Sequence, residues 1–197
     1  MSNADKPKIA ALREKSQLMS ASEIDRTVVR LANEILERNN GSAGVVLVGI
    51  CRRGVPLAER LARKMKEMEK VAPPVETLDI TFYRDDLSTV APVPIVQEVP
   101  STFTVEGKTV ILVDDVLYTG RTTRAALDAL LAHGRPQRVE LCVLIDRGHR
   151  ELPIQATYVG RVIQTSDIEV IEVRLQEIDN EERVKLCENL GTDGTSH

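Results

Sequence analysis

Aromatic residues, cysteines and histidines are scarce in this chain. It has no tryptophan, and aromatic residues make up 3% of its 197 positions. A binding surface of stacked aromatic rings, which many single-stranded nucleic acid binders use, is therefore not expected. The three cysteines are odd in number and irregularly spaced, and the three histidines show no ligand spacing. This usage indicates a reducing cytosol and no metal cluster.

Long apolar runs and an excess of positive charge are also missing. No apolar run reaches the length of a membrane-spanning helix, and the first residues lack the apolar core of a signal peptide. We therefore expect a cytoplasmic protein that does not enter a membrane. Lys and Arg total 26 and Asp and Glu total 30, so the formal net charge is −4. This balance argues against a generally basic nucleic-acid binder, although a local basic face is compatible with it.

The stretch from Val110 to Thr122, VILVDDVLYTGRT, organises the chain. Its four leading apolar residues predict a strand buried on both faces inside a parallel sheet, and two carboxylates follow where this strand should end. A glycine turn flanked by hydroxyl groups comes next, and good helix formers continue up to Gly134. Strand, turn and helix in this order predict an anion site at the helix start, where Gly120 lets the backbone approach a ligand.

VILVDDVLYTGRT resembles the signature of the type I phosphoribosyltransferases, which bind phosphoribosyl pyrophosphate (PRPP). The resemblance implies that Asp114 and Asp115 hold the ribose hydroxyls and act in catalysis. It also implies that the following loop holds the 5′-phosphate, with substrate contacts from Val116, Leu117, Tyr118, Thr119, Gly120, Arg121 and Thr122. Because adjacent strand residues point to opposite faces, the two acids can reach one ribose together only if the chain bends there.

A second strand followed by a basic loop precedes this signature. Val45–Ile50 is apolar and predicts a buried strand, and Pro56 suits the first turn of the helix that follows. Between them lie Arg52, Arg53 and a glycine, which at the carboxyl end of a strand suit a polyphosphate. The run GICRRG also fits the G-I-x-x-R-G pattern of the pyrophosphate loop in the type I family. We therefore expect Arg52 and Arg53 to face pyrophosphate.

The residues before Val45 predict an N-terminal arm followed by a helix. Ser20 and Glu23 form a capping box, and apolar residues at helical spacing continue to a stop signal that begins at Asn39. We expect residues 1–19 to be a loosely held arm. The alternative is a short helix over residues 10–18.

The middle of the chain predicts a strand and a long loop. Val75–Phe82 alternates between apolar and polar residues, as in a strand with one wetter face. The stretch 83–104 holds three prolines, and loops of this length are usually functional lids or disordered. In the type I family a flexible loop or hairpin lies here and closes over PRPP, and Val93–Val96 is a candidate strand of that hairpin. Arg84 is its catalytic candidate, facing pyrophosphate.

The C-terminal part narrows the resemblance. Arg138–Ile145 predicts another buried strand, so alternating strands and helices imply an α/β fold with a mostly parallel central sheet flanked by helices. The segment LIDRGHRELPIQATYVGR, together with DITFYRDDLS and the signature, resembles the pyrimidine regulatory proteins with uracil phosphoribosyltransferase activity, the PyrR family. This likeness spans residues 20–180.

The PyrR resemblance implies a small hood that receives the base. Its expected segments are Asp146-Arg147, Leu152–Arg161 and the strand Val170–Leu175. Arg147 and Ile171 are the candidate base contacts. The chain then divides into an arm at 1–19, a phosphoribosyltransferase domain including the hood at 20–180, and a tail at 181–197 that we expect to be disordered.

The resemblance also implies a reaction and its partners. Uracil and PRPP would give UMP and pyrophosphate, assisted by Mg²⁺ that PRPP and water mainly hold, so no protein metal ligand is expected. Two alternatives stay open: a purine phosphoribosyltransferase, which differs in its hood, and an RNA-binding attenuation regulator with little catalysis. The family likeness further implies a homodimer or larger homo-oligomer, for which Val29 and Leu36 of the first helix offer apolar contacts.

Members of the PyrR family in many bacteria bind the leader of pyrimidine-operon mRNA through a basic surface. The candidates for such a surface on the first helix are Arg26, Arg30 and Arg38. Charged residues of this kind more often form the solvent-exposed face of a helix than a binding surface. RNA-binding relatives often carry Thr and His where this chain has Val29 and Asn33, and basic residues where it has Asp167 and Val170. Fewer cations facing phosphate weaken RNA affinity, so we predict intact catalysis and weak or absent RNA binding.

Overall fold

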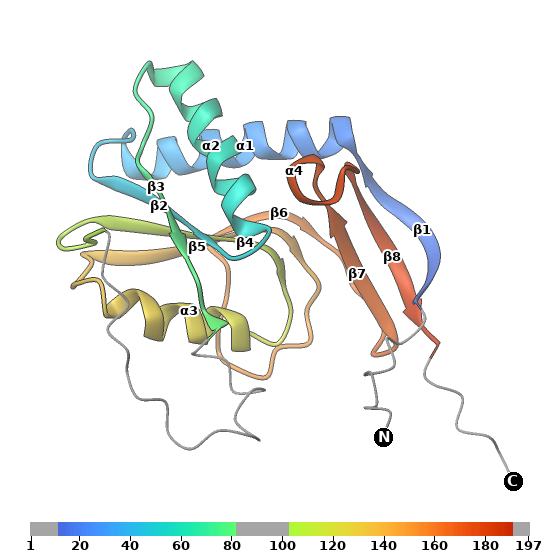
Figure 1. The fold of residues 1–197 in the computed structure, drawn as a ribbon. Coiled ribbons are helices and arrows are strands. Elements are labelled where there is room, and N and C mark those ends of the chain that lie inside the picture. The colour runs from blue at the N-terminus through green and yellow to red at the C-terminus, as the bar shows by residue number, and fades with distance from the viewer. Residues whose placement is uncertain (1–11, 82–102, 191–197) are drawn as a thin grey trace, which may run out of the picture.

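The computed structural model describes residues 12–81 and 103–190, which form two sheets and four helices (Figure 1). Five strands make a parallel sheet in the order β3-β2-β4-β5-β6. They are β2 (Val45–Ile50), β3 (Val75–Leu78), β4 (Thr109–Leu117), β5 (Arg138–Asp146) and β6 (Tyr158–Val162). The parallel α/β architecture expected from the alternating pattern is confirmed.

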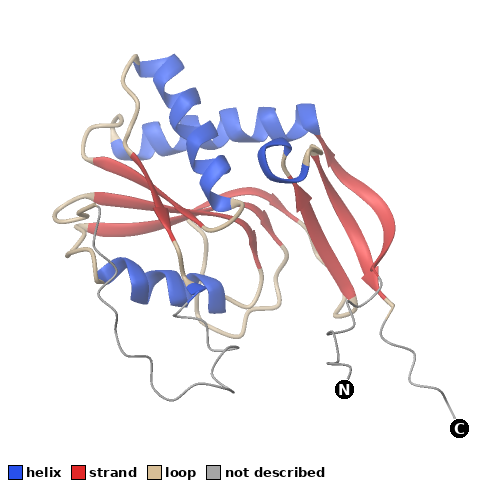
Figure 2. Ribbon diagram, viewed as in Figure 1, coloured by secondary structure: helices blue, strands red, loops and turns tan. Residues whose placement is uncertain are grey.

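Helices cover both faces of the parallel sheet (Figure 2). Those on one face are α1 (Ala21–Asn39) and α2 (Gly54–Glu69), and the one on the other face is α3 (Arg121–Leu131). One apolar core packs α1 and α2 against Ile111 and Val113, and the other packs α3 against Val110 and Leu112. Alternate residues of β4 therefore point into opposite cores, which explains why the apolar run of this strand is unbroken.

The first helix begins and ends at the predicted residues. The Ser20 N–H donates to the Glu23 carboxylate at 2.9 Å, as in a capping box, and Asn40 ends the helix in the left-handed conformation. The predicted apolar stripe faces the core. Leu36 is buried in that core, so its expected role as an oligomer contact was wrong, whereas Val29 is half-buried.

The two ends of the described chain meet in a second, antiparallel sheet of order β1-β8-β7. Its strands are β1 (Leu12–Ser20), β7 (Glu169–Arg174) and β8 (Arg183–Asn189), and the short helix α4 (Gln176–Asp179) connects β7 to β8. Leu12 pairs with Asn189 at one end, and Ser20 pairs with Arg183 at the other. Figure 1 shows this sheet at the N-terminal end of α1, beside the parallel sheet. The sheet, with α4 and the loop 163–168 before β7, is called the hood below. Of the segments expected in the hood, β7 lies in this sheet, whereas Tyr158–Val162 is β6 of the parallel sheet.

This second sheet corrects two expectations about the chain ends. Residues 12–19 belong to a strand rather than to a loose arm or a helix, and residues 183–189 are a strand rather than part of a disordered tail. Periodicity could not reveal β1, because most of its residues are exposed and Met19 alone is fully buried. The strand exists because it pairs with β8 from the opposite end of the chain.

Two strands differ in length from the prediction. β3 ends at Leu78 rather than at Phe82. β4 runs through both acids to Leu117 instead of ending before them, because β5 continues to pair with it. The expected loop at 83–104, with Arg84 and its candidate hairpin strand, lies outside the described residues except for its last two positions.

Candidate functional site

Three loops meet at the carboxyl edge of the parallel sheet, following β2, β4 and β5. The pairing of β2 with β4 ends at Gly49 opposite Val113, whereas β4 pairs with β5 as far as Leu117 opposite Asp146. The acids of β4 therefore extend beyond the end of β2, next to the loop that follows it. In α/β proteins ligands bind at this edge of the sheet.

Gly54 lets the loop after β2 pack directly on the strand of the acids. A Cβ at Gly54 would lie 2.1 Å from the Val113 carbonyl oxygen and 3.4 Å from the Asp114 Cα. No side chain fits there, so glycine is what lets the start of α2, directly after the loop 51–53, pack against Val113 and Asp114. The Cys51–Arg52 peptide bond in this loop is cis, Arg52 is exposed, and the Arg53 side chain is half-buried.

Asp114 and Asp115 lie where the alternation of β4 is interrupted. Val113 and Val116 pack against the same core, although residues three apart on a regular strand point to opposite faces. Each acid accepts a hydrogen bond from the N–H of the next residue at 2.9 Å. The side-chain alternation of β4 is thus interrupted at the acids. That both acids face one ligand stays a prediction.

Burial and mutual repulsion shape the ionisation of the acid pair. Burial raises the pKa of Asp114 well above its ordinary value, and the neighbouring Asp115 raises it further. Burial also raises the pKa of Asp115, and the Arg53 guanidinium counteracts that shift. Carboxyl oxygens accept hydrogen bonds, so the pair suits the hydroxyl groups of a ligand, which can donate them.

The loop after β4 presents the start of α3 to the same edge. Gly120 has a φ of 93°, and a Cβ there would lie 3.3 Å from the Ile154 side chain. Because α3 begins at Arg121, its first N–H groups have no partner within the helix. The Arg121 N–H donates to Thr119 Oγ1 at 3.4 Å, and the N–H groups that follow can bind an anion. Thr122 is exposed at this start, and Arg121 pairs with Glu151 at 2.7 Å on the surface.

Arg150 holds this loop in place through hydrogen bonds, a role that was not foreseen from the sequence. Its guanidinium donates to the Tyr118 carbonyl at 2.8 Å and to the Ile154 carbonyl at 3.0 Å, and it pairs with Asp146. These contacts tie the end of β5 to the loop after β4. The run DRGHR was visible in the sequence, but spacing does not tell which of its two arginines folds back on the neighbouring loop.

Arg147, the candidate base contact, holds the hood to β5. It is 6% exposed, and it donates from Nε to Thr165 Oγ1 at 3.1 Å and from Nη2 to the Glu169 carbonyl at 2.6 Å. Its Cζ lies 4.0 Å from the centre of the Tyr118 ring, and burial lowers its pKa. Ile171, a residue of β7, is buried in the core that also contains α1 and α2. Contact of either residue with a base stays a prediction.

The chain was compared with known proteins. Residues 16–178 match the family described as phosphoribosyl transferase domain. The "Bifunctional protein PyrR" of Pelotomaculum thermopropionicum is 58% identical over 176 residues, which cover 89% of this chain and 97% of that protein. A protein of the same name from Thermus thermophilus is 53% identical over 180 residues, covering 91% and 99%. The chain belongs to the PyrR family of phosphoribosyltransferases.

Solved phosphoribosyltransferases share the fold of this PyrR-family chain. The hypoxanthine phosphoribosyltransferase of Trypanosoma cruzi superposes with a TM-score of 0.68 at 17% identity, covering 89% of this chain and 98% of that one. A hypoxanthine-guanine phosphoribosyltransferase from Bacillus anthracis gives 0.66 at 21% identity, covering 90% and 99%. At these identities the likeness shows the fold alone. The fold expected from VILVDDVLYTGRT is confirmed.

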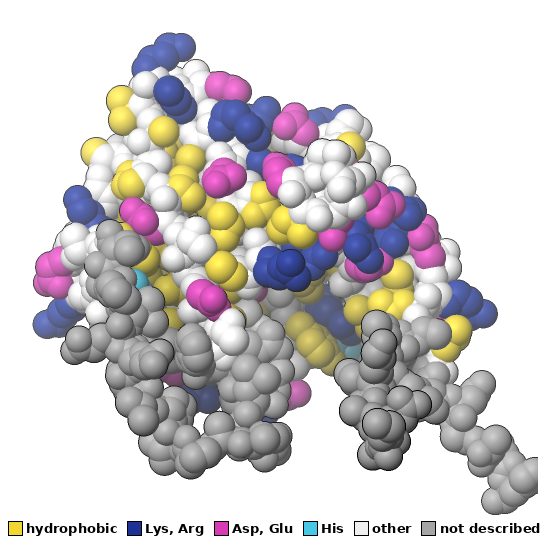
Figure 3. Space-filling view, viewed as in Figure 1, with side chains coloured by type: hydrophobic (Ala, Val, Ile, Leu, Met, Phe, Trp, Pro, Cys, Tyr) yellow, Lys and Arg dark blue, Asp and Glu magenta, His cyan; other side chains and the backbone are white. Residues whose placement is uncertain are grey.

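The three arginines considered for RNA binding lie on α1 in different surroundings. Arg26 is exposed. Arg30 donates to the Val159 carbonyl at 3.0 Å and pairs with a carboxylate of its own helix, and Arg38 lies 3.6 Å from Glu140. On the face shown in Figure 3, basic and acidic side chains are interspersed rather than segregated. In this PyrR-family member, two of the three cations are thus already engaged within the chain.

The described residues contain neither a cluster of metal ligands nor a membrane-spanning helix. Within residues 12–81 and 103–190, no group of three or more His, Cys, Asp or Glu side chains is placed to hold a metal ion. None of the helices described there combines the length and apolar character needed to cross a membrane.

Proposed function

We propose that this phosphoribosyltransferase acts on uracil, converting uracil and PRPP to UMP and pyrophosphate. The observation that supports this most is the convergence of a basic loop, an acid pair and a helix start at one edge of the sheet. These elements correspond to the pyrophosphate, the ribose hydroxyls and the 5′-phosphate of PRPP. The 58% identity to a protein named PyrR supports a pyrimidine rather than a purine as the base.

Each part of the site has a task that follows from the chemistry. The bond between the anomeric carbon and the pyrophosphate oxygen breaks early, so positive charge builds on the ribose and negative charge on the leaving group. The ring nitrogen of uracil then bonds to the anomeric carbon, and its proton passes to the departing pyrophosphate or to water. No protein nucleophile is needed, because aligning the reactants and stabilising the leaving group lower the barrier. Arg53 binds pyrophosphate, Asp114 and Asp115 bind the ribose, and residues 119–122 bind the 5′-phosphate.

Mg²⁺ belongs to this proposal as a partner of PRPP. The described residues bring two carboxyls to the site and, among themselves, no cluster of three ligands. Such a donor set fits an ion that keeps most of its ligands from substrate phosphates and water, as Mg²⁺ commonly does. When bound, the ion neutralises charge on the leaving pyrophosphate. The arginine of the basic loop and the helix start supply the remaining positive charge from the protein.

An assay over a panel of bases tests the proposed substrate. Product formation would be measured with PRPP and uracil, hypoxanthine, guanine or orotate, each over a range of concentrations. We expect kcat/KM for uracil to exceed that for the other bases by about a hundredfold or more, because buried polar groups matched to one base reject another. A preference for hypoxanthine or guanine would show that the substrate is a purine base and not uracil. Turnover with none of the bases would favour a regulator with little catalysis.

We also propose a pyrimidine-responsive regulatory role in which RNA binding is weak. The engaged Arg30 and Arg38 support this, as does Asp167, whose side chain is 92% exposed in the hood. A pyrimidine-operon leader hairpin would be titrated with and without UMP at two salt concentrations. We expect weak binding with a shallow salt dependence. Tight, UMP-stimulated binding with a steep salt dependence would show that these features do not matter.

The three free cysteines fit the cytoplasmic location that both roles require.

A further inference from the structure

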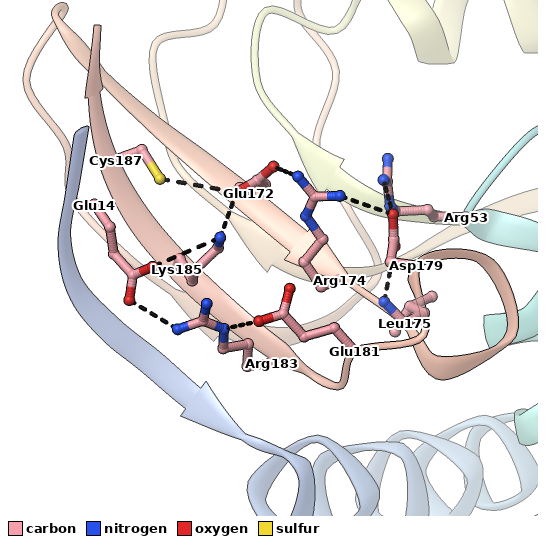
Figure 4. A network of polar contacts seen from close by, with 10 residues as sticks. All are labelled: Glu14, Arg53, Glu172, Arg174, Leu175, Asp179, Glu181, Arg183, Lys185 and Cys187. Carbon is pink, nitrogen blue, oxygen red and sulfur yellow. Dashed lines mark hydrogen bonds and ion pairs between the residues drawn. The ribbon is translucent and has the colours of Figure 1, made fainter. Parts of the chain in front are cut away.

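Arg53 does not stand alone at the end of the basic loop. Its Nε donates to Asp179 Oδ2 at 3.2 Å and its Nη2 donates to Asp179 Oδ1 at 2.8 Å, so the two side chains meet edge to edge (Figure 4). Asp179 is the last residue of α4, at the far end of the chain. The Arg53 side chain is 30% exposed and that of Asp179 is 6% exposed. The contact therefore joins a nearly buried carboxylate to a cation at the edge of the site.

Asp179 is itself held in place by its own neighbours. The Leu175 N–H donates to Asp179 Oδ2 at 3.0 Å, and Arg174 Nη1 donates to Oδ1 at 3.1 Å. Burial opposes ionisation, but the donors from Arg53 and Leu175 outweigh it and hold the pKa of Asp179 at about 2. The carboxylate is thus charged and oriented by the hood, and the longer, more exposed Arg53 side chain is the partner that it orients.

We propose that Asp179 is a positioning residue that orients Arg53 for the pyrophosphate group of PRPP. The carboxylate takes the Nε–Nη2 edge of the guanidinium, and Nη1, which has no part in this contact, remains for an anion. The Arg53 guanidinium also acts electrostatically on Asp115, lowering the pKa that burial raises. The identity of the anion rests on the function proposed above.

A purely structural role for this ion pair is less consistent with the surrounding contacts. α4 is already attached to α2 through Arg60, which pairs with Glu177 and with Glu182, each at 2.6 Å. These pairs hold the hood to the helix without involving the loop. Asp179 is the residue of α4 that reaches the loop itself, so its specific effect is on the direction of Arg53.

The first experiment compares two substitutions in the same short helix. Asp179→Asn keeps the shape and removes the charge, and Glu177→Gln removes a neighbouring ion pair while Glu182 still holds Arg60. KM would be measured for PRPP and for uracil, and pyrophosphate binding would be measured by calorimetry in the presence of Mg²⁺. We expect Asp179→Asn to raise the KM for PRPP and the Kd for pyrophosphate about tenfold, with little change in the KM for uracil. Glu177→Gln should match the unmodified protein.

A double-mutant cycle separates positioning from general loosening of the hood. If Asp179 acts through Arg53, Asp179→Asn will weaken pyrophosphate binding in the unmodified protein but not in the Arg53→Ala background. Equal losses in both backgrounds, or equal increases in the KM for PRPP and for uracil, would overturn the inference. An unmodified protein that binds neither PRPP nor pyrophosphate would instead overturn the proposed function, and the inference with it.

A second variant covers the case in which Asp179→Asn does not fold. Asp179→Glu keeps the charge and moves the carboxylate by one methylene group, so the hood retains its anion while the guanidinium is displaced. We expect a smaller loss of pyrophosphate affinity than with Asn, again absent in the Arg53→Ala background. Unchanged affinity in the folded Glu variant would contradict the positioning role.

Discussion

At the scale of single residues, the acid pair holds charge in a place where burial opposes it. Asp114 is 8% exposed, and within residues 12–81 and 103–190 its carboxyl accepts a hydrogen bond from the Asp115 N–H and pairs with no cation. A buried acid without a paired cation weakens folding, and such groups are concentrated at functional sites. We therefore expect activity to require the charge of Asp114, whereas the same charge lowers the stability of the folded chain.

Asp114→Asn tests this directly. The substitution is nearly isosteric and keeps the oxygen that accepts the Asp115 N–H. We expect kcat/KM to fall about a hundredfold or more, as for a lost contact in the transition state, while the protein stays folded. Asp128→Asn, an exposed change on α3, is the matched control and should leave activity unchanged. Full activity in Asp114→Asn would remove Asp114 from the site.

The same variant predicts a pH dependence of stability. Because burial raises the folded-state pKa of Asp114 above its ordinary value of 3.8, protonation favours the folded state. The stabilisation is present below the ordinary value and is lost as the pH rises through the folded-state pKa. Asp114→Asn mimics the protonated form, so its advantage in urea unfolding should grow from pH 5 to pH 8. An advantage that shrinks over this range would mean that the folded state favours the charged form.

Arg150 is a residue whose effect should be on stability and phosphate binding together. Arg150→Met removes the donors to the Tyr118 and Ile154 carbonyls and leaves Asp146 without its cation. We expect a loss of about 1–3 kcal/mol in the free energy of unfolding and a higher KM for PRPP. Arg13→Met, which removes an exposed ion pair with Glu188, should change stability by no more than about 0.5 kcal/mol. Similar effects of both changes would argue against the bracing role.

At the scale of secondary-structure elements, local patterns and distant pairing contribute differently. α1 is specified locally, because its apolar spacing, its capping box and its left-handed end all lie within the helix or next to it. β2 is specified by its six buried residues. By contrast, β1 has an exposed, charged sequence and depends on β8 for its backbone hydrogen bonds.

The contribution of β1 can be measured through its one fully buried side chain. Met19 has no exposed surface and packs in the core beneath α1, so Met19→Ala should lower the free energy of unfolding by about 2–4 kcal/mol. Leu12, at the other end of the same strand, is 45% exposed, and Leu12→Ala should cost about 0.5 kcal/mol or less. Urea unfolding of both variants gives the comparison. A loose arm would make the two changes equally mild.

At the scale of the whole molecule, the outer side of α1 bears on assembly. We predict a dimer or larger homo-oligomer, in which the half-buried Val29 contributes a contact. Sedimentation at micromolar concentration should give a mass at least twice the 21.8 kDa of the chain. Val29→Glu should shift the distribution toward the monomer, whereas Val71→Glu, at a 63% exposed position after α2, should not. A monomer in the unmodified protein would contradict the prediction.

The sequence by itself determined the parts of the molecule whose causes are local. The apolar run before Asp114 specifies a buried strand, Gly120 specifies the turn into α3, and the arginine-glycine run after Ile50 predicts a second anion-binding loop. Because parallel strands bring their carboxyl ends to one edge, these motifs are also predicted to lie close together. The family signature could be read for the same reason, since it consists of consecutive residues.

Only the tertiary structure decided which side chains of distant segments meet. Asp179 contacts Arg53 across 126 positions of sequence, and Arg147 donates to the Glu169 carbonyl of the hood. The spacing of residues in the sequence shows neither contact. The pairing of β1 with β8 has the same character. Contacts of this kind leave no periodic signal, because they depend on how packed elements are placed and not on the order of residues within one element. The direction in which Arg53 points is therefore a property of the folded chain.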